Sequence, residues 1–206
     1  MKQGLKNIRV VTVVVCLIGL ALIYYNYLNN KAGNKDTENN GEAKTEIETL
    51  CSYDFEEDYP KTVREVVKLH CRYQKCIYNE VMSDNTIQIL NCQMRELYCD
   101  DLLANNSEST QLEALKADKK KYEDDSRRLV NYVPDESSQV KYATVDGVDY
   151  AEIDVAYNIK IQTTGTTMNQ RYMLMKDEDE KWKIVGWADI ASKSDTEATT
   201  EATKQE

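Results

Sequence analysis

The sequence predicts an α+β protein in which an N-terminal transmembrane helix precedes three helices that pack on a curved antiparallel β-meander. Three patterns support this prediction. An apolar run fills residues 8–28, helical spacing of apolar residues follows as far as Asp125, and two-residue alternation begins after it. Helices followed by a sheet with one buried face are typical of the α+β class.

The first element is the apolar run "IRVVTVVVCLIGLALIYYNYL", residues 8–28. About 20 such residues are needed for a helix to cross a bilayer. Lys2, Lys6 and Arg9 precede or begin the run, and no acidic residue occurs before residue 29. The positive-inside rule therefore predicts that residues 1–7 are cytoplasmic and that everything after the span is extracellular. A cleaved signal or a lipoprotein signal fits less well, because "IYYNYLNN" lacks small residues and Cys16 follows a valine.

Polar segments flank the predicted extracytoplasmic domain, residues 51–191. Residues 29–50 are rich in Asn, Lys, Glu and Gly and are expected to be a flexible linker, and residues 192–206 are expected to be a disordered tail. Three of the 26 basic residues precede residue 29, whereas all 36 acidic residues follow it. An exported part this acidic is not expected to bind nucleic acid.

Three helices are predicted in the first half of the domain. The first is in "DYPKTVREVVKLHCRYQKCIYNEV", where Pro60 suits a first helical turn. The second, "SDNTIQILNCQMRELYCDDLL", is capped by Ser83 or Asp84 and runs as one helix to Leu103. The short connection between these two makes them antiparallel neighbours. "STQLEALKADKKKYEDD" is a third helix, with a thin apolar stripe and a charged outer face.

Five strands are predicted in the second half, at residues 127–135, 139–147, 148–162, 168–179 and 180–190. The third alternates most clearly, so one of its faces is expected to be buried and the other solvated. Asp146-Gly147 predicts a tight hairpin, and short turns elsewhere predict a meander. On the last strand, alternation places Trp182 and Ile184 on one side and Val185 and Trp187 on the other, and which tryptophan is inside stays open.

This order of elements resembles a known fold. The segments "DYPKTVREVVKLHCRYQKCIYNE" and "VKYATVDGVDYAEIDVAY", with the terminal "KWKIVGW", are similar to membrane-tethered proteins of the nuclear-transport-factor-2-like (NTF2-like, cystatin-like cone) fold from anaerobic Gram-positive bacteria, themselves uncharacterised. The resemblance covers residues 58–187. It implies a cone-shaped sheet that encloses a cavity, where enzymes of this fold commonly place an Asp, His or Tyr. It implies no activity, because the fold also serves carriers and scaffolds.

The candidate cavity lining consists of His70, Ile153, Val155, Tyr157 and Ile159. A cavity with apolar walls and one phenol can hold an apolar ligand but lacks the converging polar groups of a catalytic site. A single histidine beside an apolar stripe is more often a packed ring than a general base. The sequence therefore predicts no catalytic residue, no cofactor and no metal.

Five cysteines lie beyond the predicted span: Cys51, Cys71, Cys76, Cys92 and Cys99. Export permits disulfides, although an odd number leaves one thiol unpaired. Cys76 and Cys92 fall at similar distances from the turn near Ser83 and form the candidate disulfide, with buried free thiols as the alternative. A zinc site is disfavoured, because the spacings depart from C-x₂₋₄-C.

The leading hypothesis is a non-enzymatic binding module on the outside of the cytoplasmic membrane, held by a single span. Its expected partner is an unknown protein or an apolar small molecule, and a homodimer through the sheet is an option. One alternative is a scaffold-type subunit of a conjugative secretion channel, which shares the plan of a short cytoplasmic start, one span and a cone-like domain. The other is a small NTF2-like enzyme that uses His70 and Tyr157.

Overall fold

The computed structural model describes residues 44–191 of the 206-residue chain. The predicted span at residues 8–28, the cytoplasmic segment before it, the first part of the predicted linker and the predicted tail at residues 192–206 lie outside the described residues. Among the helices that are described, none combines the length and the hydrophobicity that crossing a membrane requires.

Five α-helices occur in the described part of the chain: α2 (Glu46–Cys51), α3 (Val63–Asn79), α4 (Asp84–Arg95), α5 (Asp100–Asn105) and α6 (Glu108–Asp124). Side-chain caps start most of them, because the first backbone N–H groups of a helix have no partner within it. Thr62 forms a capping box with Glu65 at the start of α3, and Ser83 and Ser107 cap α4 and α6. The three helices predicted from sequence correspond to α3, α4 and α6.

Two features of the helical half differ from the prediction. Helix α2 lies at the end of the predicted flexible linker, where Thr45 and Glu48 form a capping box and Leu50 is fully buried. The expected single helix from Ser83 to Leu103 is wrong, because it breaks between α4 and α5. The break has a tertiary cause: Ile184 N–H donates to the Leu97 carbonyl at 2.7 Å, which draws this segment into an extended pairing with the last strand.

One antiparallel sheet contains all five described strands: β1 (Arg127–Pro134), β2 (Lys141–Val145), β3 (Val148–Ile161), β4 (Thr164–Lys176) and β5 (Trp182–Ile190). The order is β1-β3-β4-β5, so the expected simple meander is corrected. The short 3₁₀ helix η1 (Ser137–Gln139) joins β1 to β2, and both strands pair with β3, β2 along its first part and β1 along its last. This is possible because β3 has 14 residues.

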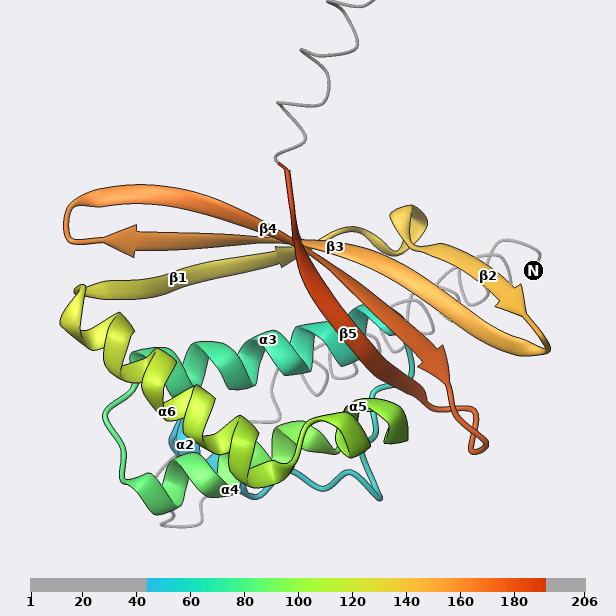
Figure 1. Cartoon of the computed structure of the whole chain (residues 1–206), viewed down its shortest axis with the longest axis horizontal. Coiled ribbons are helices and arrows are strands. Elements are labelled where there is room, and N and C mark those ends of the chain that lie inside the picture. The colour runs from blue at the N-terminus through green and yellow to red at the C-terminus, as the bar shows by residue number, and fades with distance from the viewer. Residues whose placement is uncertain (1–43, 192–206) are drawn as a thin grey trace, which may run out of the picture. The chain divides into compact units, whose positions relative to one another are not determined.

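The core lies between the sheet and the helices, which cover one face of it (Figure 1). Along β3 the buried positions alternate as predicted, from Ala151 to Ile159. Val66, Val67 and Ile77 of α3 are buried in the same cluster. The mixed class with an antiparallel sheet is therefore confirmed. Burying each such aliphatic side chain contributes about 1.5–3 kcal/mol.

A β-bulge in β5 decides where the two tryptophans lie. The pairing with β4 shifts between Met173 and Leu174, so that Val185 is an extra residue. The extra residue reverses the alternation, and Trp187 comes to the same face as Trp182 and Ile184. The prediction that placed Trp187 on the opposite face was wrong for this reason. Trp182 is buried, and Trp187 is 37% exposed.

Candidate functional site

A buried polar network surrounds His70, which α3 directs at the sheet. The ring is completely buried, and both of its nitrogens have phenol partners. Nδ1 lies 3.1 Å from the Tyr172 hydroxyl on β4, and Nε2 lies 3.0 Å from the Tyr98 hydroxyl, just before α5.

The network continues in both directions from His70. On the sheet side, the Tyr172 and Tyr157 hydroxyls are 2.6 Å apart, and Tyr157 donates to Gln74 Oε1 at 3.0 Å. The Cys71 thiol lies 3.0 Å from the same Tyr157 hydroxyl. On the helix side, Gln111 Nε2 donates to the Tyr98 hydroxyl at 3.2 Å.

The two ends of the network determine the direction of every hydrogen bond in it. Because Gln111 donates to Tyr98, the Tyr98 hydroxyl can donate to His70 Nε2, which leaves the ring proton on Nδ1 to be donated to Tyr172. At the far end Gln74 Oε1 can only accept, so Tyr157 donates to it and accepts from both Tyr172 and Cys71. One neutral tautomer of His70 therefore satisfies every hydrogen bond in the network.

Burial keeps these groups neutral. Desolvation lowers the pKa of His70 to about 3 and raises the pKa of the Cys71 thiol to about 12. It also raises the pKa values of Tyr98, Tyr157 and Tyr172. The network consequently holds neither a ready base nor a thiolate at neutral pH, and its groups are used in bonding one another.

The residues predicted to line a cavity lie in the core between the sheet and the helices. All five of them are buried: His70, Ile153, Val155, Tyr157 and Ile159. None of them lines the acidic pocket described below or the smaller pocket beside β1. The structure does bring His70 and Tyr157 into one network, through Tyr172. The sequence interpretation missed Tyr172, although its inward position follows from the alternation along β4.

The candidate disulfide between Cys76 and Cys92 does not form in the structure, where both are free thiols. Cys76 is buried in the core, whereas Cys92 is exposed and its Sγ donates to Glu108 Oε1 at 3.2 Å. The prediction considered only distance along the two helices from their turn, but the two side chains point to different surroundings.

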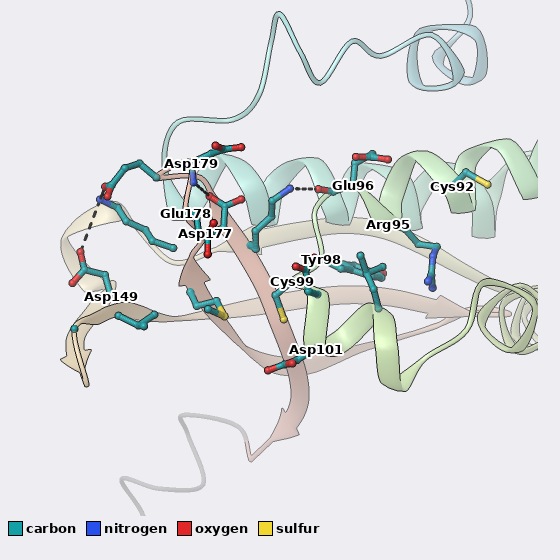
Figure 2. A pocket seen from close by; sticks show the side chains of 18 of the residues that line it. Cys92, Arg95, Glu96, Tyr98, Cys99, Asp101, Asp149, Asp177, Glu178 and Asp179 are labelled. Atoms are coloured by element: carbon teal, nitrogen blue, oxygen red, sulfur yellow. Dashed lines mark hydrogen bonds and ion pairs between the residues drawn. The ribbon is translucent and has the colours of Figure 1, made fainter.

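An open pocket of about 990 Å³ lies between the end of α4, the start of α5 and the turns after β2 and β4. Figure 2 shows its labelled acids, with Asp177, Glu178 and Asp179 in the β4–β5 turn and Glu96 and Asp101 on the helical side. Nine carboxylates and three cations line it: Glu96, Asp100, Asp101, Glu108, Asp149, Asp177, Glu178, Asp179, Glu180, Arg95, Lys176 and Lys183.

The cations in this pocket are already engaged. Lys176 forms a 2.7 Å ion pair with Glu180, and Lys183 Nζ donates to the Glu96 carbonyl at 2.7 Å. Arg95 donates to Gln111 Oε1 at 2.6 Å. Within the described part of the chain, no cation lies at ion-pair distance from Glu96, Asp100, Asp101 or Glu178. The pocket therefore presents uncompensated negative charge. No group of three or more His, Cys, Asp or Glu side chains suited to hold a metal ion occurs among residues 44–191.

The pocket and the buried network share residues. Tyr98 and Arg95 line the pocket, and both bond Gln111. The Gln111 amide nitrogen donates to the Tyr98 hydroxyl, and the Gln111 amide oxygen accepts from Arg95. The pocket wall is thus tied to the buried network by hydrogen bonds. Neither the pocket nor this link was predicted from sequence.

The fold and these two regions define a mixed α+β domain with a closed polar core and an acidic surface pocket. The chain belongs to the family described as "Domain of unknown function (DUF6715)", whose model matches residues 1–187. No curated protein matches the chain. Among solved structures, it is similar to the NMR solution structure of TraH, a candidate transfer protein of the Gram-positive conjugative plasmid pIP501. The TM-score is 0.33 at 13% identity, over 65% of this chain and 98% of TraH, which is too distant to carry an argument.

Proposed function

We propose that the chain is a membrane-anchored interaction module that binds a cationic segment of another protein in its acidic pocket. The observation that carries the proposal is a 990 Å³ pocket in which nine carboxylates face three engaged cations. A concave surface of one sign attracts and orients partners of the opposite sign. A segment rich in Lys or Arg is the chemistry that this charge favours.

The anchor and the location in this proposal come from the sequence. Residues 8–28 are the single span, the N-terminus is cytoplasmic, and the domain with the pocket meets its partner outside the cell. We also propose that the fold is NTF2-like, which is supported by helices that precede an antiparallel sheet and cover one of its faces.

Binding without turnover is the second part of the proposal. His70 has both ring nitrogens occupied, and the thiol of Cys71 is buried. Cys92 is the exposed thiol of the pocket, and desolvation together with Glu108 raises its pKa, which makes it a weak nucleophile at neutral pH. The packed interior also favours a protein partner over the apolar small molecule expected from the sequence.

The test measures binding of a lysine-rich synthetic peptide to the full-length chain in neutral detergent, with a glutamate-rich peptide as the comparison. Binding of the lysine peptide should weaken with salt and about tenfold in the triple variant Asp101→Asn, Glu178→Gln, Asp179→Asn. These three acids are exposed in the pocket, so the fold should tolerate their loss.

A matched triple variant, Glu56→Gln, Glu57→Gln, Glu113→Gln, removes the same charge from exposed positions outside the pocket. It should bind as the parent chain does. Equal weakening in both triple variants would mean that net charge alone attracts the peptide. Indifference to peptide charge would also defeat the proposal.

A further inference from the structure

Helix α3 protects the sheet edge formed by β1. The side-chain amide of Asn79 donates to the Leu129 carbonyl at 2.8 Å and accepts the Leu129 N–H at 3.0 Å, and so replaces the backbone of a neighbouring strand. Arg64 donates to the carbonyl of Asp135 at 2.8 Å, next to Pro134, which has no N–H to offer. Devices of this kind prevent an edge from pairing with another chain.

The first half of the opposite edge, on β5, is also covered. The Trp182 carbonyl accepts a hydrogen bond from the Tyr59 hydroxyl at 2.8 Å. Both backbone groups of Ile184 bond the segment before α5: its N–H donates to the Leu97 carbonyl, and its carbonyl accepts from the Cys99 N–H at 3.0 Å. The segment before α5 therefore acts as a short parallel strand that ends at Cys99.

The second half of β5 has no such cover. In an antiparallel ladder, residues alternate between bonding their partner strand and facing away from it. Because Ile184 faces away from β4 and Val185 is the bulged residue, the backbone groups of Trp187 and Asp189 also face away. No hydrogen bond from another described residue reaches them, and Trp187, Ala188 and Asp189 are exposed. This stretch contains neither proline nor lysine.

The charges around this open edge indicate its occupant. Asp100 and Asp101 follow directly on the segment that covers Ile184, and Asp189 lies on the edge itself. A second copy that paired through β5 would bring like charges together, which is destabilising across a strand pair. A strand with basic side chains would instead complement both the edge and the adjoining acidic pocket.

We propose that the partner binds as an extended segment that adds a strand to β5 at residues 187–190 and directs basic side chains toward the acidic pocket. Strand addition takes its affinity from backbone hydrogen bonds and its specificity from alternate side chains. This inference rests on the proposed function and specifies the conformation of the partner and the edge that receives it.

The experiment follows amide hydrogen exchange by NMR in the full-length chain in neutral detergent. The probes are a synthetic peptide of alternating Lys and Val and its counterpart of alternating Glu and Val. The lysine peptide alone should slow exchange of the Trp187 and Asp189 amides about tenfold. Asp189→Pro removes an outward N–H without breaking a bond to β4, and should abolish this protection. Asp189→Glu keeps both the N–H and the negative charge and serves as the matched control, with protection retained.

The outcomes separate this inference from the proposed function. Salt-sensitive binding of the lysine peptide without slower exchange at Trp187 and Asp189 would overturn strand addition and leave the pocket proposal standing. Absence of lysine-peptide binding would overturn both. Slow exchange at Trp187 and Asp189 without any peptide would also overturn the inference. Loss of that protection on dilution would identify a second copy as the occupant. Its loss on deletion of residues 192–206 would identify the chain's own C-terminal segment.

Discussion

The indole of Trp187 stacks on the phenol of Tyr172, with 5.7 Å between ring centroids and 24° between the ring planes. The same indole lies 4.9 Å from the His70 ring and 5.9 Å from the Tyr98 ring. One partly exposed residue at the open edge of β5 therefore contacts three buried members of the polar network. Through it, the packing of the core holds the exposed edge in place.

Tyr157→Phe should destabilise the domain by about 1–3 kcal/mol, because it removes the acceptor of the buried Tyr172 hydroxyl and the donor to the partly buried amide oxygen of Gln74. Urea unfolding measures the loss. Tyr132→Phe is the matched control, since Tyr132 pairs with Tyr157 across β1 and β3, and its hydroxyl has no hydrogen-bond partner among the described residues. Equal losses in the two variants would show that the network contributes no stability of its own.

His70 should make stability depend on pH. Burial lowers its pKa to about 3 from an ordinary 6.5, so between these pH values the unfolded chain binds a proton at His70 that the folded chain does not bind. The contribution of the neutral ring to the free energy of unfolding is therefore complete above pH 6.5 and is lost as the pH falls from 6.5 toward 3. Between about pH 7 and pH 4.5 the parent should lose about 2 kcal/mol more than His70→Gln, measured by urea unfolding at both pH values. Parallel losses in parent and variant would contradict the buried neutral ring.

Thiol labelling should distinguish the free cysteines. Of the five in the described domain, Cys92 is exposed and Cys51 is partly buried, whereas Cys71, Cys76 and Cys99 are buried. A maleimide reagent should therefore modify Cys92 in the native domain and reach the buried thiols only after denaturation. Peptide mass spectrometry after brief labelling reads the order. If Cys92 resists labelling until a reductant is added, the result would contradict the free thiol and support the predicted disulfide with Cys76.

Asn79→Ala should open the protected edge at β1. The variant loses both hydrogen bonds to Leu129 and should be about 1–3 kcal/mol less stable. It should also self-associate at concentrations where the parent does not, because an unpaired edge is a template for strand pairing. Light scattering and urea unfolding test both effects. Lys75→Ala, on the same helix, is the control, and an Asn79→Ala chain that behaves like it would refute the protective role.

Local patterns in the sequence were enough to predict the fold class, three of the helices and the places of all five strands. The alternation along β3 and the 3.6-residue spacing in α3 each report one buried face, which a short window of sequence contains in full. The small helix α2 was missed because its six residues bury one side chain, Leu50, and offer no periodic stripe.

By itself the sequence determined which residues are apolar on one face and where the chain turns, because those properties depend on neighbours a few positions away. Only the tertiary structure decided that His70 meets Tyr172, which lies 102 positions later, and that Leu97 pairs with Ile184 and interrupts a helix. It also decided that a bulge carries Trp187 to the inner face. The acidic pocket is assembled from three such separated segments, so no local pattern records it.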